Sequence, residues 1–249
     1  MVVLKSRREI EVMRKANLIV HEVLERLEAM IQPGVTTGDL DRVADELTRK
    51  RGGVPAFKGY QGFPANLCAS VNEEVVHGIP SRKRVLREGD IVGLDFGVIY
   101  EGYVGDAART VAVGAVSDEA RRLMSVTEEA LWVAINTCWP GKRVCDLGQA
   151  VQEYVEARGY SVVRDFVGHG IGRKMHEEPQ VPNYFNPANS TRLKPGMVLA
   201  IEPMINAGGH EVEILADGWT VVTKDRSLSA HYEHSVAVTE TGPYILSQP

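Results

Sequence analysis

The 249-residue chain has few cysteines and lacks any segment typical of export or membrane insertion. Its three cysteines, Cys68, Cys138 and Cys145, form neither a CxxC pair nor an even disulfide set, which indicates a reducing compartment. No run of about 18 uncharged apolar residues occurs, so we expect no membrane span. The N-terminal segment MVVLKSRREIEVMRK carries charges where a signal peptide needs an apolar run. The sequence therefore predicts a cytoplasmic protein.

The chain also lacks a dense basic block. It has 28 Lys and Arg against 33 Asp and Glu, a net charge of −5 and a pI near 5.8. Nucleic-acid-binding domains usually carry a basic face, so we expect no direct nucleic-acid specificity. The short run Arg82-Lys83-Arg84 is interpreted as a solvated loop.

Several common catalytic motifs are missing. There is no GxSxG, so serine hydrolase chemistry has no support. The segment HEEPQ (176–180) begins like the zinc motif HExxH, but it lacks the second histidine and contains a helix-breaking proline. The segment GHGIG (168–172) resembles a phosphate loop, but no helix pattern follows it. Nucleotide binding and zincin-type catalysis are therefore not predicted.

Apolar periodicity predicts an α+β protein with two helix pairs, each followed by strands. Loops and short strands are expected over 56–76, and strands again from Gly159 to Val238. A β-hairpin is expected over 90–113, with its turn near Glu101-Gly102. The helices are expected over 6–31, 37–51, 118–137 and 146–158.

The order of elements repeats at an offset of 107 residues. Pro33-Gly34 matches Pro140-Gly141, and the segment LREGDIVGLD (86–95) lies over LKPGMVLAIE (193–202). The second match pairs Asp95 with Glu202. A turn-helix-turn pattern can recur by coincidence, but two segments at one offset favour a duplication. We expect one domain, residues 1–249, with pseudo-twofold halves of about 1–115 and 116–249.

Four acidic residues stand where strands should be buried. Asp95 and Glu202 are each expected at the end of an apolar strand, Asp106 lies on the return strand of the hairpin, and Glu233 opens the apolar strand HSVAV. One such acid would be interpreted as salt-bridged or helix-capping. Four converging carboxylates repel one another unless cations compensate them. Two divalent ions would balance the four negative charges, so the pattern favours a two-metal centre.

The ligand types narrow the metal and suggest a fifth ligand. Carboxylate-rich sites suit Mn²⁺, Fe²⁺ or Co²⁺ better than zinc. His169 in GHGIG is the best candidate for an imidazole ligand, because the flanking glycines allow a sharp turn and close approach. A lone histidine is more often a structural core or surface residue. The glycines and the nearby His176 favour a role in the site here.

Five segments in order give the chain a family resemblance. They are NEEVVHGIP (72–80), LDFGVIYEGYVGD (94–106), GHGIGRKMHEEP (168–179), IEPMINAG (201–208) and DGWTVVTKDRSLSAHYEH (217–234). Together the segments resemble type I methionine aminopeptidases over nearly the whole chain. The resemblance implies the pita-bread fold, an antiparallel sheet flanked by two helix pairs, with pseudo-twofold symmetry.

The resemblance also assigns roles by position. It implies five metal ligands, namely Asp95, Asp106, His169, Glu202 and Glu233. It implies that His77 and His176 contact the substrate. As a mechanistic hypothesis, we expect Glu202 to accept a proton from the attacking water and to pass it to the leaving amine. It places a methionine pocket, which could equally be plain core packing, at Tyr60, Phe63, Cys68, Met175 and Trp219. His231 stands where many relatives carry Gln, either beside the ligands or exposed.

The implied function is removal of the initiator methionine from nascent proteins that have a small second residue. It requires two divalent ions (Co, Mn or Fe), and the family precedent is a monomer with transient ribosome contact. The segment GHEVEILA (209–216) lacks the lysines that some relatives use towards the ribosome. Two other functions remain open: another pita-bread peptidase of the Xaa-Pro type, and a non-catalytic pita-bread binding protein.

Overall fold

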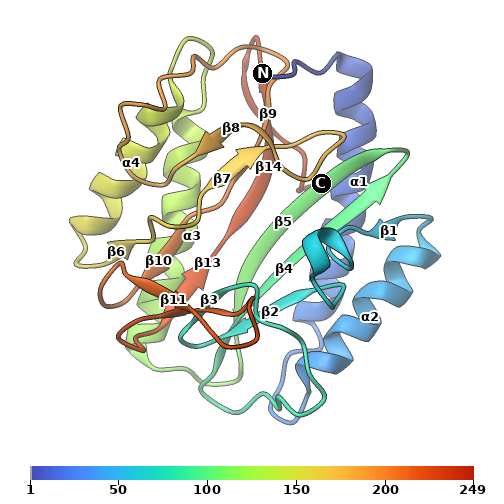
Figure 1. The fold of residues 1–249 in the computed structure, drawn as a ribbon, viewed down its shortest axis with the longest axis vertical. Helices are drawn as coiled ribbons and strands as arrows, with labels where there is room; N and C mark the ends of the chain where they lie inside the picture. Colours follow the sequence, from blue (N-terminus) through green and yellow to red (C-terminus); the bar gives the residue numbers. More distant parts are fainter. Residues whose placement is uncertain (1) are drawn as a thin grey trace.

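The computed structural model describes residues 2–249 and places two helix pairs beside one large sheet (Figure 1). The helices are α1 (Arg7–Glu28), α2 (Thr37–Lys50), α3 (Asp118–Thr137) and α4 (Val144–Glu156), with a short 3-10 helix η1 (Tyr60–Gly62). All four predicted helices are confirmed, although α1 ends three residues early and α4 begins two residues early. Within residues 2–249 no helix is both long and apolar enough to cross a bilayer.

Local sequence sets where α1 begins and which face it buries. The Ser6 side chain accepts from the backbone N–H of Glu9 at 3.3 Å, and the Glu9 carboxylate accepts from the backbone N–H of Ser6 at 2.8 Å. This reciprocal capping satisfies two otherwise unpaired donors. The side chains of Met13, Val20 and Leu27 are fully buried against the sheet side of the helix. Burying each contributes about 1.5–3 kcal/mol.

The central sheet has nine strands, all paired antiparallel. Their order is β1-β4-β5-β14-β9-β7-β8, with β2 also on β4 and β15 also on β14. The strands are β1 (Val54–Pro55), β2 (Cys68–Val71), β4 (Ile91–Tyr100), β5 (Tyr103–Ala112), β7 (Gly168–Gly170), β8 (Glu177–Val181), β9 (Val198–Ile201), β14 (Glu233–Thr239) and β15 (Gly242–Ile245). The predicted hairpin is β4–β5, and its turn lies at Glu101-Gly102 as expected.

One expectation about the strands is wrong. Asp95 does not end its strand but lies in the middle of β4, paired with Cys68 on one side and Ala108 on the other. The apolar run stops at Asp95 because this side chain faces the site. The backbone hydrogen bonds of β4 continue past Asp95, since a strand can include a polar residue that faces a cavity. Glu202 does follow the end of β9, and Glu233 does open β14.

Two small sheets complete the face that carries the site. One has the order β13-β10-β6 and the other β11-β12-β3. Their strands are β3 (Glu74–Val76), β6 (Ser161–Val162), β10 (Met204–Asn206), β11 (Val212–Ile214), β12 (Val221–Thr223) and β13 (Ser229–His231). One apolar core lies among α1, α2 and β4, and a second lies among α3, α4 and β9. Figure 1 shows the two helix pairs on opposite flanks, with β5 and β14 between them.

Backbone hydrogen bonds repeat at the offset found in the sequence. The N–H of Gly34 bonds the carbonyl of Leu86 at 2.9 Å, and the N–H of Gly141 bonds the carbonyl of Leu193 at 3.0 Å. Isolated β-bridges join Thr36 to Val85 and Arg143 to Arg192. Every partner in the second set is the first plus 107. The two helix pairs are thus anchored to the sheet in the same way. The division into halves at about residue 115 stays a prediction.

Candidate metal and substrate site

Strand register places the four acids on one face of the sheet. Asp95 and Glu233 both lie opposite Ala108, from β4 and β14 respectively. Asp106 lies opposite Gly97, two residues from Asp95 on β4, so it is a diagonal neighbour on the same face. The small Ala108 side chain between the acids leaves room above it.

The second half of the chain supplies the remaining candidates to the same face. Ile201 pairs with His234, so Glu202 follows next to Glu233. His169 pairs with Ala200, two residues before Glu202. The imidazole Nε2 of His169 lies 3.4 Å from Oε1 of Glu202. All five predicted ligands therefore converge from β4, β5, β7, β9 and β14.

Three of these five residues, Asp106, His169 and Glu233, are buried, and several of the acids have a carboxylate oxygen without a hydrogen-bond partner. Within residues 2–249, one carboxylate oxygen each of Asp95, Asp106 and Glu233 has no partner. Ligand atoms of Asp106, His169 and Glu233 all lie within 4.8 Å of one another. A buried carboxylate without a partner costs several kcal/mol. A carboxylate-rich set with one imidazole fits a divalent cation, which would satisfy the unpaired oxygens.

The protein environment raises the pKa of every acid in the cluster. Burial raises the pKa of Asp95 to about 7. Burial, followed by repulsion from neighbouring carboxylates, raises the pKa values of Asp106, Glu202 and Glu233 well above the ordinary range. Without cations the folded protein thus retains protons on these groups that the unfolded chain loses near pH 4.

We predict that the metal-free protein loses stability as the pH rises from 7 to 8. A carboxyl whose pKa is raised by folding holds its proton more tightly in the folded state, so stability falls with rising pH until the folded pKa is passed. The buried histidines act in the opposite direction but only weakly, because their ordinary pKa of about 6.5 lies below this window. For each carboxyl that is still protonated in the folded state, the free energy of unfolding falls by about 1.4 kcal/mol per pH unit, which lowers the melting temperature by roughly 3–6 °C.

Thermal melts of chelator-treated protein at pH 7 and pH 8 measure this slope. The Asp106→Asn variant, which removes one titrating group, should give a shallower slope. A melting temperature that stays level or rises between pH 7 and 8 would count against the raised pKa values.

His169 is held in the tautomer that a metal ligand needs. Its Nδ1 lies 3.0 Å from the carbonyl oxygen of Gly170, so Nδ1 carries the hydrogen and donates it. Nε2 then presents its lone pair towards the acids. Burial lowers the pKa of His169 to about 3, which keeps the ring neutral at physiological pH.

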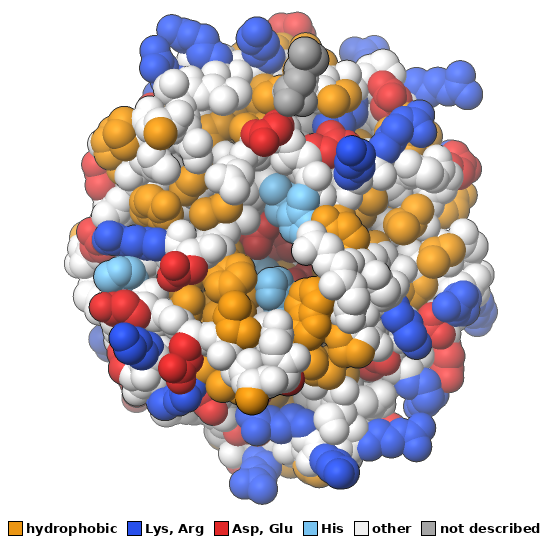
Figure 2. All heavy atoms as spheres, viewed as in Figure 1, with side chains coloured by type: hydrophobic (Ala, Val, Ile, Leu, Met, Phe, Trp, Pro, Cys, Tyr) orange, Lys and Arg blue, Asp and Glu red, His pale blue; other side chains and the backbone are white. Residues whose placement is uncertain are grey.

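All of the predicted site residues line one cavity of about 180 Å³. Figure 2 shows the opening, with histidine and acidic side chains in the hollow and hydrophobic side chains around it. An apolar cavity of about 150 Å³ holds a molecule the size of benzene. This cavity therefore suits a single amino-acid side chain above the acid cluster.

Two further histidines lie in the cavity wall. The Nδ1 of His176 is 2.7 Å from the Tyr60 hydroxyl, and its ring centroid is 4.2 Å from that of His169. His77 follows β3 with φ of 60°, a conformation that is unfavourable for a side chain with Cβ. Burial lowers the pKa of His77 to about 4 and lowers that of His176. Both rings are thus neutral and face the space above the acids.

Aromatic and sulfur-containing side chains form the rest of the wall. Phe63 and Trp219 pack edge to face at 5.2 Å between ring centroids, and Trp219 also contacts His77. Met175 and Cys68 are buried beside them, and burial raises the pKa of the Cys68 thiol well above its ordinary value. The thiol is therefore protonated and acts as an apolar wall.

Sequence reasoning missed several residues in the lining, including Gln61, Val76, Phe166, Val167 and Met204. Phe166 contacts the His77 ring at 5.5 Å between centroids. Closeness in sequence to a predicted ligand was a weak indication for two of them, because Phe166 lies three residues before His169 and Met204 lies two residues after Glu202. His231 is buried and not exposed, with its Nε2 3.7 Å from Oε2 of Glu202.

Comparison with known proteins identifies the family. Residues 11–240 match the model of metallopeptidase family M24. The chain belongs to metallopeptidase family M24. It is 53% identical over 247 residues to a methionine aminopeptidase of Clostridium acetobutylicum, which covers 99% of each chain.

Solved structures agree with the sequence match. The crystal structure of a Thermotoga maritima methionine aminopeptidase superposes with a TM-score of 0.98, at 45% identity and with all of both chains covered. A Pyrococcus furiosus prolidase gives a TM-score of 0.82 at 25% identity, covering 99% of this chain but 66% of the prolidase. The M24 chain thus has the expected pita-bread fold, and its buried Asp/His/Glu cluster fits the divalent metal site of a metallopeptidase.

Proposed function

We propose that this M24 enzyme removes the N-terminal methionine from newly made peptides, with a preference for a small second residue. The observation that carries the proposal is the cavity itself. A floor of unpaired buried carboxylates lies beneath a pocket of aromatic and sulfur-containing side chains, in a chain about half identical to a methionine aminopeptidase along its whole length.

The five ligand assignments belong to this proposal. Asp95, Asp106, His169, Glu202 and Glu233 would together hold two cations, with Asp106 and Glu233 on the two adjacent strands that lie between the strands of the other three. Divalent ions held there supply Lewis acidity and bring the pKa of water close to neutrality.

The protein residues around the floor would orient the substrate and move protons. Glu202 lies between two imidazoles and can accept a proton from the attacking water and pass it to the leaving amine. His176 is oriented by the Tyr60 hydroxyl and can donate a hydrogen bond to the oxygen on which charge develops. His77, fixed by Phe166 and Trp219, would position the leaving amide.

The pocket fits a methionine side chain. Thioethers make favourable contacts with ring edges, and Phe63, Trp219 and Tyr60 offer aromatic surface. Met175 and Cys68 add polarizable walls that carry no charge. The ring of Phe166 narrows the space beside His77, which favours a small second residue in the substrate.

An activity assay tests this function against its first rival. We expect hydrolysis of Met-Ala-Ser in the presence of Mn²⁺ or Co²⁺, and little hydrolysis of Ala-Pro dipeptides. Thorough chelation should abolish the activity and added Mn²⁺ should restore it. Activity that survives chelation, or a preference for Xaa-Pro substrates, would contradict the proposal. Absence of any hydrolysis with full metal occupancy would favour the non-catalytic alternative.

Several finer points also remain proposals. We propose two ions per chain, with manganese, iron and cobalt all suited to the ligand set. We further propose a cytoplasmic monomer that meets nascent chains and contacts the ribosome transiently. The segment 209–216, which includes β11, contains no lysine and presents Glu211 and Glu213, which disfavours docking of the ribosome on this segment.

A further inference from the structure

A buried ion pair lies next to His176, outside the cavity. The Nζ of Lys5 is 2.7 Å from Oε2 of Glu177, and their side chains are only 4% and 12% exposed. The two residues are 172 positions apart in the chain. Lys5 also donates to the carbonyl of Val3 at 3.1 Å. A desolvated pair of this kind is a weak source of stability, so a role in positioning has to be considered.

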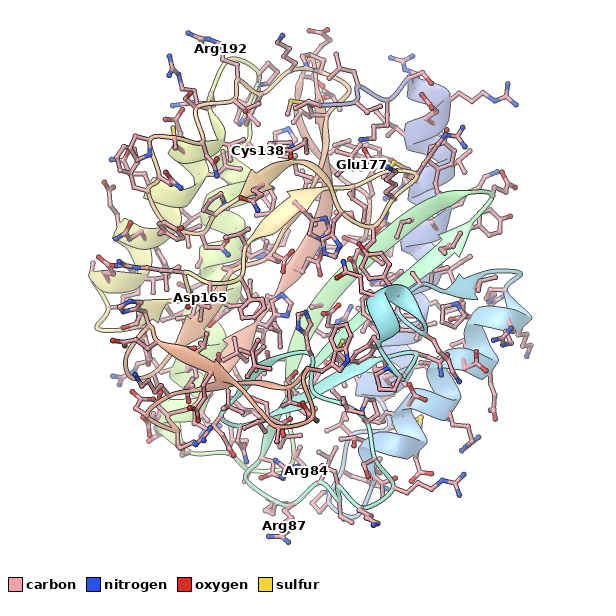
Figure 3. All side chains as sticks on the ribbon, in the orientation of Figure 1. Arg84, Arg87, Cys138, Asp165, Glu177 and Arg192 are labelled. Atoms are coloured by element: carbon pink, nitrogen blue, oxygen red, sulfur yellow. The ribbon has the colours of Figure 1, made fainter. Side chains whose placement is uncertain are left out.

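The Glu177 side chain contacts the loop that carries two of the cavity residues. This loop runs from β7 to β8 and presents Met175 and His176 to the cavity. The second carboxylate oxygen of Glu177, Oε1, accepts from the backbone N–H of Lys174 at 3.2 Å. One carboxylate thus joins the loop to Lys5. Figure 3 labels Glu177, on the side of the molecule where the chain enters α1.

Lys5 is itself fixed to the sheet. Its backbone N–H donates to the carbonyl of Gly196 at 2.6 Å, just before β9 begins. The loop approaches Lys5 closely at Gly172, where an added Cβ would lie 2.6 Å from both Lys5 Cε and Glu177 Oε1. The carbonyl of Gly172 accepts from the backbone N–H of Val104 at 2.8 Å, which connects the loop to β5. Little space is left for an alternative arrangement.

We propose that Lys5 and Glu177 are positioning residues that hold the 171–177 loop so that His176 stays opposite Tyr60 and above the acid cluster. The proposal rests on the proposed function. According to this proposal, the N-terminal segment before α1 contributes to catalysis without touching the substrate. A displacement of about 1 Å in a catalytic group can cost on the order of 100-fold in rate.

The test combines each substitution with loss of His176. Lys5→Met and Glu177→Gln should each lower kcat for Met-Ala-Ser by about 10- to 100-fold. They should change metal affinity, measured by calorimetry, by less than about threefold, because neither residue is a proposed ligand and none of the five ligands lies within the 171–177 loop. In a His176→Ala background the same changes should cost less than about threefold, since the group that they position is gone.

Controls separate positioning from folding and from the function itself. Arg42→Met breaks an exposed ion pair with Glu46 on α2 and should leave kcat unchanged. If Lys5→Met does not fold, the Glu177→Gln variant tests the positioning role in its place. An unchanged kcat in both variants, or an equal loss with and without His176, would overturn the positioning role. If the wild type does not cleave Met-Ala-Ser at all, the proposed function fails first, and the two failures are thereby distinguished.

Discussion

His169→Ala is expected to abolish aminopeptidase activity by loss of metal. Its Nε2 presents a lone pair towards Glu202, and its Nδ1–H is committed to the backbone carbonyl of Gly170. Removing even an outer hydrogen-bond partner of a ligand lowers metal affinity about 10- to 100-fold, so loss of the ligand itself should cost at least about 100-fold. Calorimetric titration with Mn²⁺ measures the affinity, and hydrolysis of Met-Ala-Ser measures the consequence.

The partly exposed His210, whose side chain is 41% exposed, provides a matched control. His210→Ala removes an imidazole of the same size outside the cavity and should leave both metal affinity and activity unchanged. If His169→Ala kept two tightly bound ions, the assignment of His169 as a ligand would be wrong.

His176→Ala should separate metal binding from turnover. The ring lies beside His169 but bonds Tyr60, so we expect the variant to bind metal as the wild type does. Removing one donor to a developing oxyanion costs about 100- to 1000-fold in kcat, and a loss of that size is expected here. The effect on KM should be small, because the interaction strengthens only in the transition state.

Steady-state kinetics with saturating Mn²⁺ and a parallel metal titration check this separation. Tyr60→Phe removes the hydroxyl that orients the ring and should cost less than His176→Ala. A variant lacking His176 that turns over at the wild-type rate would remove the histidine from the proposed mechanism.

Much of the candidate site could be predicted because the sequence pattern repeats at an offset of 107 residues. The offset of 107 aligns Asp95 with Glu202 in the sequence alone, and the same offset recurs in the hydrogen bonds that anchor both helix pairs. His169 was found because glycines flank it. In the structure the neighbouring strands do need those glycines, since a Cβ at Gly168 would lie 2.4 Å from the carbonyl oxygen of Ala200.

Other features required the register of strands that are distant in sequence. The sequence predicts a strand end at Asp95, because an apolar run usually stops where burial stops. Here β4 continues, and the acid faces a cavity in mid-strand. Met204 and Phe166 reach the lining from β10 and from the loop before β7. Lys5 and Glu177 are far apart in the sequence, and no local sequence pattern predicts their contact.

A calorimetric titration of the metal-free wild type with Mn²⁺, repeated in buffers of different ionisation enthalpy, tests the central claim most directly. The account predicts two ions per chain, with net proton release at pH 7, because cations displace protons from carboxyls whose pKa values burial has raised. Binding of no ion, or of a single ion without proton release, would contradict the idea that acids from both halves of the chain share a pair of cations.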